Sequence, residues 1–197
     1  DGKHTTFAIE GFGNVGTFAA KYLTDAGATF AAVSDSKGCL YNPQGINYTR
    51  LMRVKEKTGS VTNYTPGTIL DGKKLFELDV DVIIPAALPD VITAENKDRI
   101  KATLIVEAAN IPIKPDVEAQ LEKKGILIVP DVVANAGGVI SSYAEYRGLN
   151  PKDMFPLVQK KIVQNTKIIL DHAKKQHLTT REAALDIAMK RVKQKAR

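Results

Sequence analysis

The stretch TTFAIEGFGNVGTFAAKYLTDA, residues 5–26, decides how this chain folds. Apolar and β-branched residues fill positions 5–9, a glycine turn follows at residues 11–16, and an alanine-rich helical pattern comes next. A lone G-x-G-x-x-G is a weak signal, because fourteen glycines in 197 residues can reach this spacing by chance. Here it stands between a predicted strand and a predicted helix, which is the context that dinucleotide binding requires. The stretch therefore predicts a dinucleotide site.

Each glycine of the turn has its own physical role in such a site. Gly11 permits the tight turn after the strand, Gly13 lets a pyrophosphate approach the backbone, and Gly16 lets the helix pack close to the sheet. The N–H groups of the first helical turn then face the phosphates. Asp35 lies nineteen residues after Gly16, at the end of the next predicted strand. It is the acidic residue expected to contact the ribose.

Strands alternate with helices along the chain, which predicts an α/β fold with a doubly wound, mostly parallel sheet. Residues 60–78 are irregular, and we expect them to carry little chemistry. After residue 148 the pattern changes to two helices, the second starting at a capping box formed by Thr179 and Glu182. We therefore predict a dinucleotide-binding domain at residues 1–148 and a helical extension packing on it at residues 149–197. Further strands are expected at residues 30–35, 80–85, 103–107 and 126–129, and helices at residues 46–57, 93–99 and 115–124.

Composition excludes several classes of protein. With 44% hydrophobic and 25% charged residues, the chain is typical of globular proteins. No apolar run reaches the roughly 18 residues of a membrane span, and no secretory signal is visible. The one cysteine, Cys39, excludes an internal disulfide and fits a reducing compartment. We therefore expect a cytoplasmic protein with no membrane partner.

The positive charge of the chain is concentrated at its end. Residues 151–197 carry twelve Lys and Arg against four Asp and Glu. Such a tail could bind nucleic acid. However, most of these charges lie opposite regular apolar faces, and no aromatic residue is interleaved with the basic run. Solvated helix surfaces are the favoured interpretation, and we expect no nucleic-acid partner.

Three asparagines follow or open loops at the expected carboxyl edge of the sheet. They are Asn14, Asn110 and Asn135. An amide offers a donor and an acceptor together, which suits a nicotinamide carboxamide or a ribose diol. The alternative for each one is a helix or turn cap. Recurrence at three successive strand ends favours ligand contact.

Five motifs, in this order and spacing, resemble the cofactor-binding domain of the glutamate dehydrogenase family, which also includes leucine and phenylalanine dehydrogenases. The resemblance covers the whole chain and implies a Rossmann-type fold with two closing helices. Departures are Ala108 and Ile111, where the family commonly has glycine, and Ala144, where it often has an aromatic residue. The motifs are GFGNVG at residues 11–16, SDSKG at 34–38, PAA at 85–87, VEAAN at 106–110 and ANAGGV at 134–139.

The resemblance implies a role for individual residues. Ser142 would contact the side-chain carboxylate of the substrate, or, in the alternative, is a solvated helix hydroxyl. Asn135 would hold the nicotinamide amide. The pyrophosphate would be cradled by Gly11, Phe12, Gly13, Asn14, Val15 and Gly16. The adenosine ribose would lie near Asp35, Ser36 and Lys37, and the path of the second ribose near Ala86, Ala87 and Asn110.

The family reaction is oxidative deamination of L-glutamate to 2-oxoglutarate and ammonia, with hydride transfer to nicotinamide. The resemblance places its catalytic lysine and aspartate in a preceding substrate domain that these 197 residues do not contain. We therefore expect this chain to bind NAD or NADP without turnover, and the full-length protein to be a homo-hexamer. Asp35 favours NAD, whereas Lys37 could admit the phosphate of NADP. An alternative is a stand-alone, non-catalytic nucleotide-binding module.

Overall fold

The computed structural model describes residues 4–195, and for Pro151 and Lys195 it describes the backbone alone. Contacts divide the chain into two compact units that meet between Leu127 and Ile128. Residue 148, after which we expect the dinucleotide-binding domain to end, lies in the second unit between the helices α5 (Gly137–Tyr146) and α6 (Pro151–Gln176). The packing of residues 149–197 on the first domain stays a prediction.

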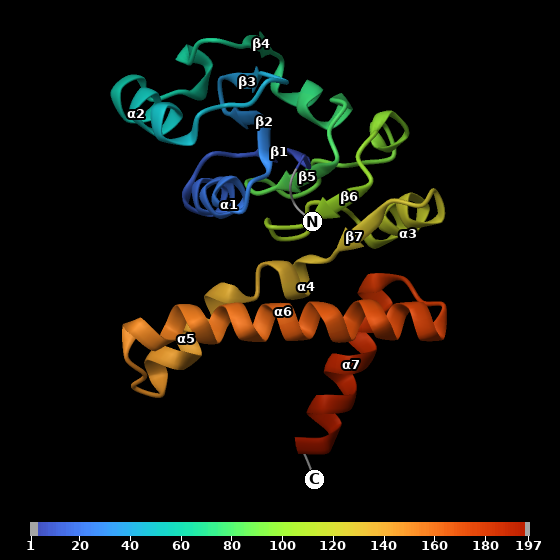
Figure 1. Ribbon diagram of the computed structural model, residues 1–197. Coiled ribbons are helices and arrows are strands. Elements are labelled where there is room, and N and C mark those ends of the chain that lie inside the picture. The colour runs from blue at the N-terminus through green and yellow to red at the C-terminus, as the bar shows by residue number, and fades with distance from the viewer. Residues whose placement is uncertain (1–3, 196–197) are drawn as a thin grey trace. The chain divides into compact units, whose positions relative to one another are not determined.

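A seven-stranded sheet has the order β4-β3-β2-β1-β5-β6-β7 (Figure 1). Strand β1 pairs in parallel with β2 on one side and with β5 on the other, and β5 pairs in parallel with β6. Two strands that the sequence did not predict, β3 and β4, extend the sheet as an antiparallel edge. The strands are β1 (Thr6–Glu10), β2 (Thr29–Asp35), β3 (Gly38–Tyr41), β4 (Thr68–Leu70), β5 (Val82–Pro85), β6 (Leu104–Val106) and β7 (Leu127–Val129).

The order of the strands reverses at β1. The chain runs from β1 to β2 and on to the edge, and then returns to the other side of β1 as β5. In open α/β sheets, ligands bind outside the carboxyl ends of the strands at such a switch point. The expected doubly wound sheet is confirmed, and its switch point lies where β1 ends at Glu10 and β5 ends at Pro85.

Helices complete the first unit. Helix α2 begins at its N-cap Asn47, whose side chain accepts from the Arg50 N–H, and ends at Gly59 with a left-handed φ of 75°. The helix expected at residues 93–99 is a short 3₁₀ turn instead. The helical segments are α1 (Asn14–Asp25), α2 (Tyr48–Thr58), η1 (Val61–Asn63), η2 (Gly72–Glu77), η3 (Lys97–Arg99) and α3 (Pro115–Lys123).

Aromatic rings anchor the core beneath α1. Phe7 of β1 and Phe30 of β2 are each 1% exposed, and their rings stack with centroids 5.0 Å apart. Phe12, from the glycine turn, packs on Phe30 with centroids 6.2 Å apart. Offset stacking of this kind adds about 0.5–1.5 kcal/mol to simple burial. The core therefore ties the start of the glycine turn to both central strands.

The second unit consists of helices. The long helix α6 contacts α4, α5 and α7, and Figure 1 shows α5 and α7 leaving its two ends. The expected capping box is confirmed, because the Glu182 carboxylate accepts from the N–H and hydroxyl groups of Thr179. Arg181 also pairs with the buried Asp131 at 2.9 Å. The helices are α4 (Asp131–Ala134), α5 (Gly137–Tyr146), α6 (Pro151–Gln176) and α7 (Thr180–Lys195).

Cys39 lies fully buried in β3. Burial raises the pKa of its thiol to about 12, so almost no thiolate exists at neutral pH. We expect a thiol-specific disulfide reagent to leave Cys39 unmodified in the folded chain and to modify it fully in denaturant. Rapid labelling of the folded chain would contradict the burial of β3.

Candidate functional site

The predicted strand, glycine turn and helix are confirmed around residues 10–14. Strand β1 ends at Glu10, Gly11 has a φ of +92°, and α1 begins at Asn14 after the N-cap Gly13. Gly11 therefore adopts a left-handed conformation that other residues rarely take. No side chain caps the first turn from Gly13. The start of α1 thus presents main-chain N–H groups, which favour anions.

The three glycines differ in what surrounds them. A Cβ added to Gly16 would lie 2.0 Å from the carbonyl oxygen of Gly11, and one added to Gly11 would lie 2.5 Å from the Cβ of Ala87. A Cβ on Gly13 would meet nothing within 4 Å. Gly11 and Gly16 are therefore required by the packing of the protein, whereas Gly13 leaves space that a ligand could use.

The other residues of the turn face different surroundings. The Phe12 side chain is part of the core, so Phe12 can offer a ligand its backbone. Asn14 is exposed, and Val15 is 48% exposed. The turn is thus open to solvent along its Gly13–Asn14–Val15 side.

The two residues that follow β5, Ala86 and Ala87, lie beside the glycine turn, and we call them the second wall of the site. Ala86 is half-buried and Ala87 is exposed, and both lie against Gly11. Oε2 of Glu10 accepts hydrogen bonds from the N–H groups of Ala86, at 3.3 Å, and Ala87, at 3.1 Å. Burial raises the pKa of the Glu10 carboxyl, although these N–H groups lower it in part. Glu10 was not identified from the sequence. A carboxylate at the end of a mostly apolar strand was the signal that could have revealed it.

Asp35 lies at the end of β2, as the motif predicts, but its carboxylate is turned toward the protein. Oδ1 accepts from the Lys37 N–H at 2.9 Å and from the Ser60 hydroxyl at 3.2 Å. Oδ2 accepts from the Val61 N–H at 2.8 Å and from Nζ of Lys55 at 2.7 Å. The side chain is 7% exposed. The carboxylate therefore has four protein donors before any ligand arrives.

These partners set the charge of Asp35. Burial works to raise the pKa of the carboxyl, but Lys55 and the N–H groups of Val61 and Lys37 outweigh it. The pKa of Asp35 therefore lies below its ordinary value. The negative charge is present at neutral pH and is largely compensated by Lys55.

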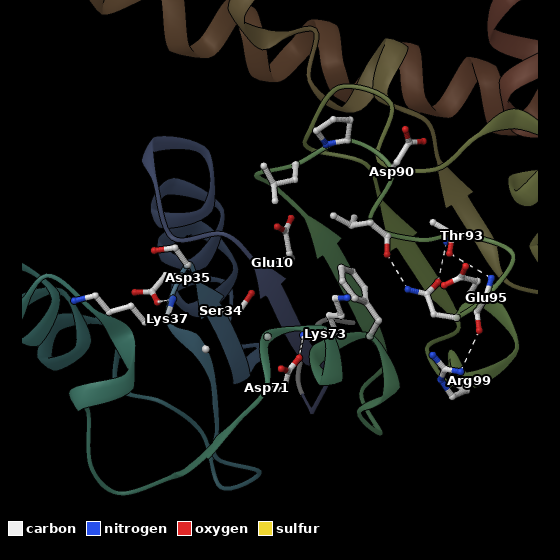
Figure 2. Close-up of a pocket in the computed structure, with 18 residues that line it drawn as sticks. Glu10, Ser34, Asp35, Lys37, Asp71, Lys73, Asp90, Thr93, Glu95 and Arg99 are labelled. Carbon is white, nitrogen blue, oxygen red and sulfur yellow. Dashed lines mark hydrogen bonds between the residues drawn. The ribbon is translucent and has the colours of Figure 1, made fainter.

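A cavity of about 610 Å³ opens beside these residues. Figure 2 shows Asp35 and Lys37 on one side of it, Asp90 and Glu95 on the other, and Glu10 between them. Its lining comes from the end of β1, residues 34–38, residues 71–76 and residues 88–99. Residues 60–78, expected to carry little chemistry, thus supply Asp71 and Lys73 to the cavity and two donors to Asp35.

The remaining predicted residues lie in separate places. Ser36 and Lys37 are exposed and line the cavity, and Asn110 is exposed after β6. Asn135 and Ser142 belong to the second unit, where Asn135 follows α4 and Ser142 is exposed on α5. Their contribution to a site stays a prediction.

Ile111 has a strained backbone beside this edge of the sheet. Its φ is +47°, which is unfavourable for a β-branched residue. The Ile111 carbonyl accepts from the Asp90 N–H at 3.1 Å, and Asp90 also has a positive φ, 53°. The backbone conformation at Ile111 therefore favours glycine, which agrees with the glycine that the family commonly has at this position.

The part of the chain that the structure describes contains neither a membrane-spanning helix nor a metal-binding group of side chains. No helix among residues 4–195 is long and apolar enough to span a membrane. No group of three or more His, Cys, Asp or Glu in this range could hold a metal ion.

A glycine turn at the switch point of a mostly parallel sheet, with a cavity beside it, defines a Rossmann-type domain. The sequence model of the glutamate, leucine, phenylalanine and valine dehydrogenase family matches residues 1–197. The chain belongs to this family of amino-acid dehydrogenases.

Individual relatives agree with this assignment. The chain is 42% identical over 197 residues to glutamate dehydrogenase of Aeropyrum pernix, a match that covers 95% of the chain and 47% of the relative. It is 39% identical over 195 residues to NAD-specific glutamate dehydrogenase of Staphylococcus aureus, covering 96% and 47%. It is also similar to the crystal structure of hetero-hexameric glutamate dehydrogenase from Thermus thermophilus, with a TM-score of 0.86, 26% identity and coverage of 97% and 46%. The chain thus spans about half the length of these relatives.

Proposed function

We propose that this chain is the dinucleotide-binding domain of a glutamate dehydrogenase. The observation that carries the proposal is the open space at Gly13, the N-cap of α1, where an added Cβ would meet no protein atom within 4 Å. A pyrophosphate needs such a close approach to the backbone, together with the N–H groups that begin α1. Membership of the dehydrogenase family supports the same function.

The residues present fit a nicotinamide dinucleotide. Residues Gly11, Phe12, Gly13, Asn14, Val15 and Gly16 would hold the pyrophosphate, and the cavity beside Ser36 and Lys37 would take the adenosine. Ala86, Ala87 and Asn110 would line the path of the second ribose, and Asn135 would orient the nicotinamide amide. When bound, the nicotinamide accepts a hydride from the substrate carbon, and the protein supplies position and electrostatics. Ser142 would donate a hydrogen bond to the side-chain carboxylate of glutamate.

We propose that NAD is preferred and that NADP is also bound. The NAD-specific relative from Staphylococcus aureus supports the preference. The charge of Asp35 is compensated by Lys55 and three further donors, so the carboxylate repels a 2′-phosphate less. This compensation supports binding of NADP. The exposed Lys37 adds a positive charge at the same turn.

The whole protein would deaminate L-glutamate oxidatively to 2-oxoglutarate and ammonia. We propose that residues outside this chain form a substrate domain, that this chain alone has no turnover, and that the full-length protein assembles as a homo-hexamer. A hetero-hexameric structural relative supports assembly through six subunits. The single buried thiol of Cys39 and the family activity are the grounds for a cytoplasmic location.

Calorimetric titration of the purified chain with NAD, and separately with NADP, tests the proposal. We expect saturable binding of both, with NAD the tighter ligand, and no glutamate-dependent reduction of either. A folded chain that binds neither dinucleotide would contradict the binding function. Measurable deamination by this chain would contradict the proposal that turnover needs a separate substrate domain.

A further inference from the structure

Glu10 places a carboxyl group at the last position of β1 (Figure 2). The residue is 8% exposed, it lines the cavity, and Gly11 follows it directly. Its register partners are Ser34 on β2 and Pro85 on β5, neither of which is charged. Buried carboxyl groups are uncommon, and their polar atoms need partners.

The partners of the Glu10 carboxylate belong to the second wall. Its Oε2 accepts from the N–H groups of Ala86 and Ala87, and its main-chain oxygen accepts from Ala86 at 2.8 Å. Ala87 in turn packs against Gly11 so closely that Gly11 has no room for a Cβ. Glu10 therefore fixes the position of the second wall relative to the glycine turn.

Burial governs the protonation of Glu10. It raises the pKa of the carboxyl, and the N–H groups of Ala87, Leu88 and Ala86 offset part of that rise. Several charged groups of the cavity pair with residues outside it: Asp35 with Lys55, Arg99 with Glu77 and Asp90 with Lys114. The charged side chains that share the cavity with Glu10 are Asp35, Lys37, Asp71, Lys73, Asp90, Glu95 and Arg99.

We propose that Glu10 is a positioning residue that holds Ala86 and Ala87 against the glycine turn and takes up a proton from solvent when a dinucleotide binds. This inference rests on the proposed function, because it needs a pyrophosphate at residues 11–16. The ligand brings negative charge beside the carboxylate and displaces water from the cavity, and both effects favour the neutral carboxyl. Binding and proton uptake are then linked, so each strengthens the other.

Protonation leaves the hydrogen bonds of the second wall in place. A neutral carboxyl keeps a carbonyl oxygen, which can accept from both N–H groups. Glutamine has the same shape and the same acceptor but does not titrate. Glu10→Gln therefore imitates the protonated residue. Glu10→Ala removes the side-chain acceptor, so the N–H of Ala87 loses its partner, whereas the N–H of Ala86 keeps the main-chain oxygen at position 10.

Calorimetric titration with NAD, in two buffers of different ionisation enthalpy, measures the protons taken up. For the unmodified chain we expect uptake and an affinity that rises as the pH falls, by at most about tenfold per pH unit for one proton. For Glu10→Gln we expect no uptake, an affinity independent of pH over the same range, and tighter binding at neutral pH. Glu10→Ala should bind more weakly at every pH.

Glu56→Gln is the matched control, because it removes the same charge from an exposed position on α2, outside the cavity. It should keep the proton uptake of the unmodified chain. Circular dichroism at each pH checks that all variants are folded. If Glu10→Gln binds NAD with unchanged uptake and pH dependence, the role of Glu10 is wrong while the proposed function stands. If no folded variant, nor the unmodified chain, binds NAD, both inferences fail.

Discussion

Gly13→Ala is expected to weaken NAD binding by about tenfold to about 100-fold while the stability of the chain hardly changes. The added Cβ meets no protein atom within 4 Å, and Gly13 has φ −91° and ψ −159°, which alanine can adopt. It would, however, enter the space that a pyrophosphate needs. Overpacking by one methyl group costs about 1–3 kcal/mol, which sets the expected loss of affinity. Calorimetric titration and urea denaturation measure the two quantities separately.

Gly16→Ala provides the contrast. Its Cβ would lie 2.0 Å from a main-chain oxygen of Gly11, so the turn itself must move. This variant should lose both stability and NAD binding. Equal NAD affinity in Gly13→Ala and the unmodified chain would show that ligands do not approach Gly13, and would remove the observation on which the proposed function depends.

The glycine turn and the alternation of strands and helices could be predicted because their signals are local. Gly11 needs a left-handed φ and Gly16 needs the absence of a Cβ, and both needs are visible in residue type and spacing. The capping box at Thr179 and Glu182 is equally local, since its partners are three residues apart. Local signals of this kind survive folding because tertiary contacts reinforce them.

The antiparallel edge of the sheet could not be predicted in the same way. Strands β3 and β4 are short, and β4 has no buried side chain to reveal a period of two. Strand β3 pairs with β2 across the short turn that follows Asp35, whereas β4 joins β3 across a long segment of chain, with Leu70 opposite Cys39. Pairings at that separation leave little trace in a short window of sequence.

The candidate site shows the same limit. The motif correctly placed Asp35 at the end of a strand but could not show where its carboxylate points, because Lys55, Ser60 and Val61 come from distant positions. Glu10 was missed because its partners, Ala86 and Ala87, offer main-chain N–H groups, which every residue type except proline carries. Main-chain partners of this kind are invisible in a sequence.

Asp35→Ala is expected to lower the free energy of unfolding of the first unit by about 2–3 kcal/mol at neutral pH. The change leaves Nζ of Lys55 and the N–H group of Val61 without the carboxylate that they bind at 2.7 and 2.8 Å. Removing one partner of a buried ion pair costs more than the pair contributes, and the 27% exposure of Lys55 reduces that cost. Urea denaturation, with hydrogen exchange of the β2 amides as a local readout, measures the loss.

The pH dependence of this loss has a definite sign. The pKa of Asp35 is lower in the folded chain than its ordinary value, so its contribution to stability is complete above the unfolded pKa of about 3.9. It disappears as the pH falls through the folded pKa, so the gap between the unmodified chain and Asp35→Ala should close in acid. Asp25→Ala is the control, because it breaks an exposed ion pair with Lys21 and should change stability little. Equal losses in the two variants would show that Asp35 does not join β2 to α2 and to residues 60–61.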